Sequence, residues 1–89
     1  MPWKTEFDRE ARKEFQKLDK PIRERILKFL RRVESLPDPR AAGDGLTAEL
    51  AGLWRYRVGD YRLICKIEDA VMIVLIVRVA HRSVAYKKQ

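Results

Sequence analysis

The stretch from Leu53 to Ile67 most constrains what this chain can fold into. It contains two runs in which aromatic or aliphatic residues alternate with charged ones, and these runs flank Gly59-Asp60. A glycine at the first central position, followed by a polar residue, is typical of a two-residue β-hairpin turn. We therefore predict a hairpin in which Val58 pairs with Tyr61, because such a turn sets the register of both strands.

This register gives the hairpin two chemically different faces, because side chains alternate along a strand. One face carries Trp54, Tyr56, Tyr61, Leu63, Cys65 and Ile67, which we expect to pack in the core, and the other carries Arg55, Arg57, Arg62 and Lys66. Arg57 lies directly opposite Arg62, and like charges opposed on a sheet repel. We therefore predict a phosphate site on the basic face. The alternative is a solvated arginine surface in which each charge contributes little.

The N-terminal third predicts a short edge strand and a helical hairpin. Residues 3–7 alternate weakly, as in an edge strand, and Asp8 can cap the helix that follows. That helix has an apolar stripe of Ala11, Phe15 and Leu18, while Arg9, Arg12, Lys13, Glu14 and Lys17 are expected to face solvent. Pro21 suits the first turn of a second helix, which should end near residue 36. Its apolar residues at helical spacing are Ile22, Ile26, Phe29, Leu30, Val33 and Leu36.

The rest of the chain predicts a loop, the hairpin and a third strand. Residues 37–45 read as a loop, 46–50 as a short helical turn, 68–70 as a second turn and 71–79 as an apolar strand. With that turn, Leu63 faces Leu75, and Arg62 faces Ile76 with Arg78 further along the same face. The helices would then cover Val71, Ile73, Leu75 and Val77. Met72, Val74 and Ile76 would be left for the C-terminal tail or a partner.

Composition narrows the class of protein and of partner. A chain of 89 residues has room for one core, so we expect a single α+β domain over residues 1–89. The net charge of +7 indicates an anionic partner, either nucleic acid or an acidic protein segment. The single Cys65 excludes an internal disulfide and a cysteine-rich metal site. With a polar start and no apolar run long enough to span a bilayer, we expect a cytoplasmic protein.

The order of strand, helical hairpin, three-strand meander and basic tail resembles the RelE/ParE superfamily of bacterial toxins. The resemblance spans essentially the whole chain and is closest to the RelE-type mRNA interferases, through residues 53–63 and through His81, Arg82 and Tyr86. It implies an α+β RelE-like fold with a mostly antiparallel meander and a short basic C-terminal segment. It also implies the toxin of a type II toxin–antitoxin pair. Such a toxin is a metal-independent, cofactor-free endoribonuclease that cleaves mRNA in the ribosomal A site and binds a cognate protein antitoxin.

The resemblance also implies roles for individual residues. Arg62 matches the phosphate-binding arginine after Gly-x-Tyr, Arg82 the arginine after the last strand, and Tyr86 the C-terminal tyrosine. Together with His81 these form the candidate catalytic set. The candidate RNA-binding set is Arg55, Arg57, Lys66 and Arg78. Arg55 and Arg57 stand where the family often has lysines, which removes one candidate general base because arginine stays protonated.

Two of these residues have competing interpretations. His81 is the only histidine and, by analogy with some relatives, is a candidate general base, but an exposed histidine at a strand end is equally ordinary. Tyr86 suits stacking on a base or shuttling a proton, whereas a tail aromatic can also cover Met72 and Ile76. No carboxylate pair or metal-ligand spacing is visible, so we expect neither metal nor cofactor.

Two other functions remain compatible with the same residues. A ParE-like inhibitor would share the fold, bind DNA gyrase and cleave no RNA. A small RNA-binding module would bind RNA with steep salt dependence and leave it intact. The arginine cluster with Arg82 and Tyr86 favours the nuclease.

Overall fold

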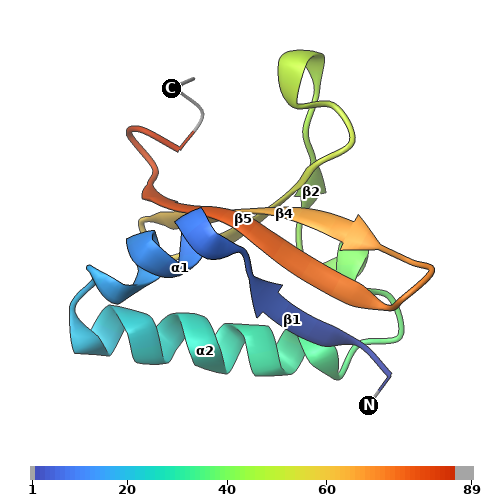
Figure 1. Ribbon diagram of the computed structural model, residues 1–89, viewed down its shortest axis with the longest axis horizontal. Coiled ribbons are helices and arrows are strands. Elements are labelled where there is room, and N and C mark those ends of the chain that lie inside the picture. The colour runs from blue at the N-terminus through green and yellow to red at the C-terminus, as the bar shows by residue number, and fades with distance from the viewer. Residues whose placement is uncertain (1, 86–89) are drawn as a thin grey trace.

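The computed structural model describes residues 2–85 and confirms the predicted α+β architecture (Figure 1). The sheet is built from β1 (Lys4–Phe7), β2 (Asp44–Gly45), β3 (Trp54–Val58), β4 (Tyr61–Glu68) and β5 (Ile73–His81), in the order β1-β5-β4-β3-β2. The helices are α1 (Arg9–Gln16) and α2 (Lys20–Glu34), with short 3-10 turns η1 (Pro39–Ala42) and η2 (Ala48–Leu50). Strand β1 runs parallel to β5, and the other neighbours are antiparallel. No helix in the described part of the chain has the length and apolarity needed to cross a membrane.

Both helices begin where the sequence predicts. The Asp8 carboxylate accepts a hydrogen bond from the Ala11 backbone N–H at 2.9 Å, which satisfies one of the free donors at the start of α1. Pro21 lies in the first turn of α2. Since a proline there removes only a donor that the helix could not use, it stops α1 from continuing and lets α2 begin.

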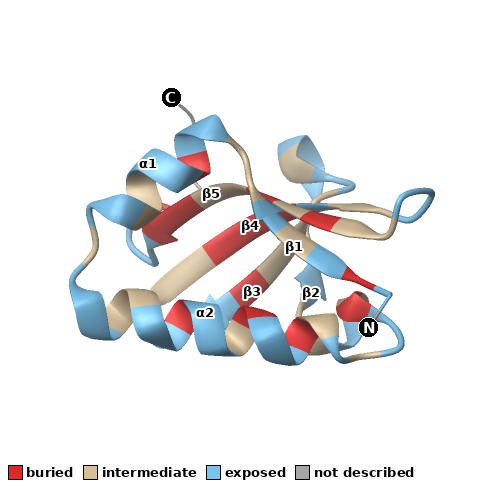
Figure 2. Ribbon diagram, turned by 60° about the horizontal axis from the view of Figure 1, so that its bottom comes forward, coloured by how far each residue is buried: buried red, intermediate tan, exposed pale blue. Residues whose placement is uncertain are grey.

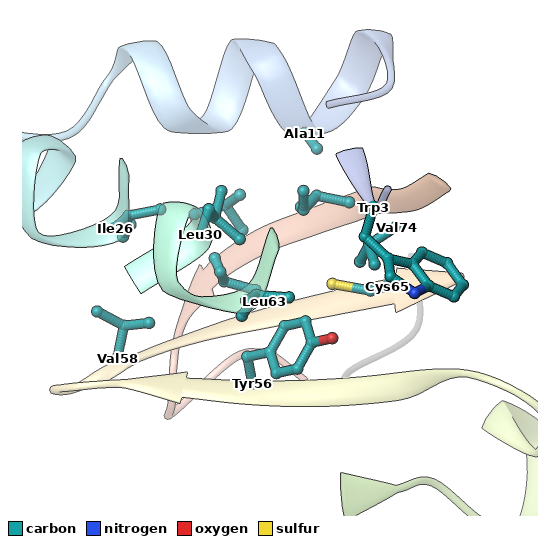
Figure 3. Close-up of a cluster of buried hydrophobic side chains, with 12 residues drawn as sticks. Trp3, Ala11, Ile26, Leu30, Tyr56, Val58, Leu63, Cys65 and Val74 are labelled. Atoms are coloured by element: carbon teal, nitrogen blue, oxygen red, sulfur yellow. The ribbon is translucent and has the colours of Figure 1, made fainter. Parts of the chain in front are cut away.

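The apolar face of the β3–β4 hairpin forms the floor of the core, and α2 covers it (Figure 3). Tyr56, Leu63 and Cys65 are fully buried there against Ile26 and Leu30 of α2. Figure 2 shows the buried residues of α2 on the side that faces the sheet. The predicted packed position of Cys65 is thus confirmed.

Tyr56 connects this core to the loop before β2. Its hydroxyl donates a 2.8 Å hydrogen bond to the Pro39 carbonyl, and its ring lies 5.5 Å from that of Phe29. Burial raises the pKa of the Tyr56 phenol, so the side chain stays neutral and keeps its hydrogen to donate. The loop is therefore held beside β3, where β2 can pair with it.

The predicted register of the β3–β4 hairpin is confirmed. Val58 pairs with Tyr61, Arg57 with Arg62 and Tyr56 with Leu63. Gly59 has φ +59°, a left-handed conformation that glycine adopts without steric cost. The turn residues therefore determine which side chains share each face.

The predicted register of β5 is wrong. Leu63 pairs with Val79 instead of Leu75, and Arg62 pairs with Ala80 instead of Ile76. The connection is longer than predicted, because Met72 closes it with φ +55° and donates its N–H to the Asp69 carbonyl. A shift between Ile64 and Cys65 then leaves one extra residue on β5, a β-bulge.

The register change reverses the faces of the first half of β5. Val74 and Ile76 are fully buried under the helices, whereas Ile73, Leu75 and Val77 are only partly buried. The expectation that Met72, Val74 and Ile76 await a cover is therefore wrong. Val71, predicted to lie under the helices, is 60% exposed in the connection.

Contrary to the prediction, Glu14 does not face solvent. Its Oε1 accepts a hydrogen bond from the Val79 N–H at 2.7 Å, and its Oε2 lies 3.8 Å from Nε of Arg78. Strand β1 pairs with β5 only as far as Ile76, so no strand within residues 2–85 lies beside the next part of the β5 edge. The Glu14 carboxylate satisfies that edge and docks α1 against β5.

Candidate functional site

An open cavity of about 500 Å³ lies beside the hairpin turn. The residues that line it are Arg55, Arg57, Arg62, His81, Arg82 and Ser83. Five of these were predicted from the sequence as site residues, and the structure brings them together. The sixth, Ser83, was not predicted.

The cavity is assembled from the three strands of the meander. Strand β3 supplies two arginines, β4 supplies Arg62, and the end of β5 supplies His81. The backbone N–H of Arg82 donates to the Asp60 carbonyl at 2.8 Å, which attaches the segment after β5 to the hairpin turn. Residues distant in sequence therefore meet at one end of the sheet.

Arg57 and Arg62 face each other across the hairpin, as the register predicts. Nη1 of Arg62 donates to the backbone carbonyls of Gly59 and Tyr61, at 2.9 and 3.0 Å. These neutral acceptors orient the guanidinium group without cancelling its charge. Arg57 is exposed and makes no hydrogen bond or salt bridge within residues 2–85. The two like charges are thus held close together with no anion between them in the described part of the chain.

Two carboxylates lie near the other arginines. Nη2 of Arg55 donates to Oδ2 of Asp44 at 2.9 Å, and this hydrogen bond holds the pKa of Asp44 below its usual range, with a further contribution from the charge of Arg57. Nε of Arg82 lies 3.8 Å from the Asp60 carboxylate, and both side chains are largely exposed. Four arginines against two carboxylates leave the cavity positive.

His81 is oriented by its neighbours. Its Nδ1 lies 2.9 Å from the Ser83 hydroxyl and 3.2 Å from the Ser83 backbone nitrogen. A backbone N–H can only donate, so in that contact Nδ1 accepts and the proton of a neutral ring sits on Nε2. The opposite tautomer, which a general base needs at Nε2, would donate from Nδ1 to the Ser83 hydroxyl.

Tyr61 is not part of the buried cluster, contrary to the prediction. It is half-buried, and its ring meets that of His81 edge-on, with 5.6 Å between the centroids. Since Tyr61 pairs with His81 across β4 and β5, it supports the imidazole from the neighbouring strand.

Three predicted residues do not join the cavity. Lys66 is exposed further along β4 and does not line it. Arg78 lies on the predicted face but pairs with Ile64 and forms an ion pair with Glu14, with its side chain 21% exposed. Tyr86 lies outside the described residues.

The sequence and the fold match known toxins. Residues 5–86 match the family described as the ParE toxin of the type II toxin–antitoxin system, parDE. The toxin RelG of Mycobacterium tuberculosis is 35% identical over 88 residues, covering 99% of this chain and all of RelG.

Solved structures of toxin–antitoxin complexes contain chains similar to this one in fold and sequence. A chain of the Mycobacterium tuberculosis toxin–antitoxin complex RelBE2 superposes with a TM-score of 0.82 at 33% identity, covering 93% of this chain and 94% of that one. A chain of the archaeal RelE–RelB complex from Pyrococcus horikoshii OT3 gives a TM-score of 0.73 at 30% identity, covering 96% of this chain and all of that one. The predicted RelE-like fold is confirmed, and the chain belongs to the RelE/ParE family of toxins of type II toxin–antitoxin systems.

Proposed function

We propose that this toxin is a ribosome-dependent endoribonuclease that cleaves mRNA in the ribosomal A site and so inhibits translation. The observation that carries the proposal is the cavity in which four arginines converge, with Arg57 and Arg62 directly opposed. A phosphate between these two side chains would turn their repulsion into two attractions. Guanidinium groups also match the paired oxygens of a phosphate by bidentate hydrogen bonding.

RNA supplies its own nucleophile, so the protein has little covalent chemistry to perform. The 2′-oxygen forms a bond to phosphorus while the bond from phosphorus to the 5′-oxygen breaks. The 2′-hydroxyl loses a proton and the leaving 5′-oxygen gains one, which yields a 2′,3′-cyclic phosphate and a 5′-hydroxyl. Arg57 and Arg62 would stabilise the charge that builds on the phosphorane, and Arg82 that on the leaving oxygen. This chemistry requires neither a metal ion nor a cofactor.

Among the described residues that line the cavity, His81 is the one whose side chain commonly acts as a general acid or base. With Nδ1 accepting from the Ser83 N–H, its Nε2–H can donate a hydrogen bond to a phosphate oxygen or to the leaving 5′-oxygen and stabilise the charge there. With the other tautomer it can accept the proton of the 2′-hydroxyl instead. Ser83 suits both states, because its hydroxyl accepts as well as donates.

We further propose that the toxin acts in the cytoplasm and is held inactive by a cognate protein antitoxin. The RelBE2 and archaeal RelE–RelB structures that it resembles are toxin–antitoxin complexes. With a net charge of +7, this chain suits a partner with an acidic segment that covers the arginine cavity.

The first experiment is a cleavage assay with purified, metal-stripped toxin, programmed ribosomes and end-labelled mRNA. Wild type should cleave on ribosomes, and Arg62→Ala should be slowed by about 100-fold or more, the usual effect of removing a donor that stabilises a transition state. Arg12→Ala is the matched control, because it removes an exposed arginine from α1. Urea unfolding should place Arg62→Ala within about 0.5 kcal/mol of wild type.

Intact RNA in every lane would contradict the proposal, as would equal rates for wild type and Arg62→Ala. One observation then favours a second function, inhibition of DNA gyrase. The matching family is described as the ParE toxin, a name shared with the gyrase-binding members of the superfamily. A supercoiling assay with the same proteins would test it directly.

A further inference from the structure

A second cavity, of about 360 Å³, lies between α2 and the β3–β4 turn. It is lined by Arg25, Lys28, Phe29, Arg32, Arg57, Val58 and Gly59. From sequence alone the basic side of α2 reads as a solvated surface that could add non-specific attraction to ribosomal RNA. The structure instead gathers three of its cations and Arg57 of the hairpin around one hollow, and the cleavage chemistry above uses only Arg57 of this set.

The three basic residues from α2 are arranged to face this hollow together. They are spaced three and four residues apart, so they lie on one stripe of the helix. All three are exposed, and none forms a salt bridge within residues 2–85. The cavity therefore carries four positive charges and no carboxylate among its lining residues.

The side chains are also held in place. A β-carbon on Gly59 would stand 2.8 Å from Nη1 of Arg25, which shows that this guanidinium group rests on the hairpin turn. The guanidinium carbon of Arg32 lies 5.1 Å from the centre of the Phe29 ring, a cation–π contact that fixes its direction. Both arginines are thus oriented before any ligand arrives.

Arg57 lines this cavity and the first one, so the two adjoin across β3. Strand β2 pairs only with Trp54 and Arg55, and the edge of β3 at Arg57 and Val58 has no strand beside it among the described residues. The path from one cavity to the other therefore passes Arg57 and is not blocked by a described strand.

We propose that the second cavity binds phosphates of the same RNA strand, next to the nucleotide held in the first cavity. The inference rests on the proposed function and extends it, because it makes α2 part of the substrate-binding surface. Charge alone would also suit an acidic peptide. Continuity through Arg57 with the cavity that is proposed to hold the cleaved phosphate favours RNA.

The test measures how affinity depends on RNA length. The probes are fluorescent 2′-O-methyl RNA oligonucleotides of three and nine nucleotides, which cannot be cleaved, and binding is followed by anisotropy at several salt concentrations. The variant Lys28→Gln/Arg32→Gln removes two charges from the cavity. The control Lys20→Gln/Arg31→Gln removes two exposed charges from the same helix outside it.

Wild type should bind the nine-mer more tightly than the three-mer. The cavity variant should lose most of that gain, about tenfold, and keep its affinity for the three-mer. Its salt slope for the nine-mer should fall by about 1.4, because each phosphate contact on a single strand contributes about 0.7. The control should stay within about threefold of wild type at both lengths. If the double variant unfolds, Lys28→Gln against Arg31→Gln makes the same comparison.

Three results would overturn the inference. The first is equal affinity of wild type for both lengths, and the second is equal weakening of binding by the variant and the control. The third uses a polyglutamate peptide as an additional probe: a cavity variant that keeps its affinity for the nine-mer but loses affinity for the peptide would identify a protein-binding surface. Failure of the proposed function is separate. It is an absence of mRNA cleavage on ribosomes by wild type, whatever the oligonucleotides show.

Discussion

At the scale of single residues, Cys65 shows how burial removes reactivity. Its side chain is fully buried in the core, and this burial raises the pKa of its thiol well above the usual range. The thiolate, which is the nucleophilic form, is therefore absent at neutral pH. Cys65 contributes packing to the hairpin floor and no chemistry to the cavity.

This shift predicts how stability depends on pH. Because the folded protein holds the Cys65 proton more tightly than the unfolded chain, stability is complete below the unfolded pKa of about 8.5 and falls as pH rises above it. The loss should approach about 1.4 kcal/mol per pH unit. Urea unfolding of wild type and Cys65→Ala between pH 7 and 10 tests this. Cys65→Ala should start less stable and decline less steeply, whereas parallel curves would contradict the assignment.

At the scale of elements, the β3–β4 hairpin and β5 show what local sequence determines. Gly59-Asp60 allows one tight turn, so the register of Arg55, Arg57 and Arg62 follows from the sequence. The connection before β5 has no such signal. It is closed by Met72 with φ +55°, a conformation that sequence does not indicate for methionine. Neither it nor the β-bulge was predictable, so the register of β5 was wrong.

The position of α1 depends on Glu14, which the helical pattern assigned to solvent. Glu14→Ala leaves the buried Val79 N–H without its acceptor and Arg78 without its carboxylate. We expect a loss of about 1–3 kcal/mol in the free energy of unfolding, measured in urea. Glu10→Ala is the control, since it breaks only the exposed 3.8 Å contact with Lys13 and should cost less than about 0.5 kcal/mol. Equal effects of the two variants would show that Glu14 is not an anchor.

At the scale of the whole molecule, the residues of the cavity were predicted from two kinds of sequence information. Its arginines on β3 and β4 follow from the hairpin register, and His81 and Arg82 came from the family resemblance. Arg78 and Lys66 do not line the cavity, because Arg78 forms a tertiary contact with Glu14 of α1 and Lys66 lies further along β4. Ser83 carries no sequence signal, and the sequence shows the basic side of α2 only as a charged helix face. Only the fold brings both beside the hairpin.

The two cavities also account for part of the basic character of the chain. Seven of its 20 lysines and arginines line two adjoining cavities that share Arg57, and neither cavity has a carboxylate among its lining residues. In the proposed mechanism this surface is a track for RNA, and the cleaved phosphate lies between Arg57 and Arg62. The 2′-hydroxyl of the RNA attacks that phosphate.

The most direct test of attack by the 2′-hydroxyl uses an mRNA in which a single nucleotide is replaced. Wild-type toxin is incubated with programmed ribosomes and end-labelled mRNA that carries a 2′-deoxynucleotide at the mapped cleavage position, with all-ribose mRNA as the control. We expect the control to be cleaved to a 2′,3′-cyclic phosphate and a 5′-hydroxyl, and the substituted mRNA to stay intact at that position. Cleavage of the substituted mRNA at an unchanged rate would contradict it.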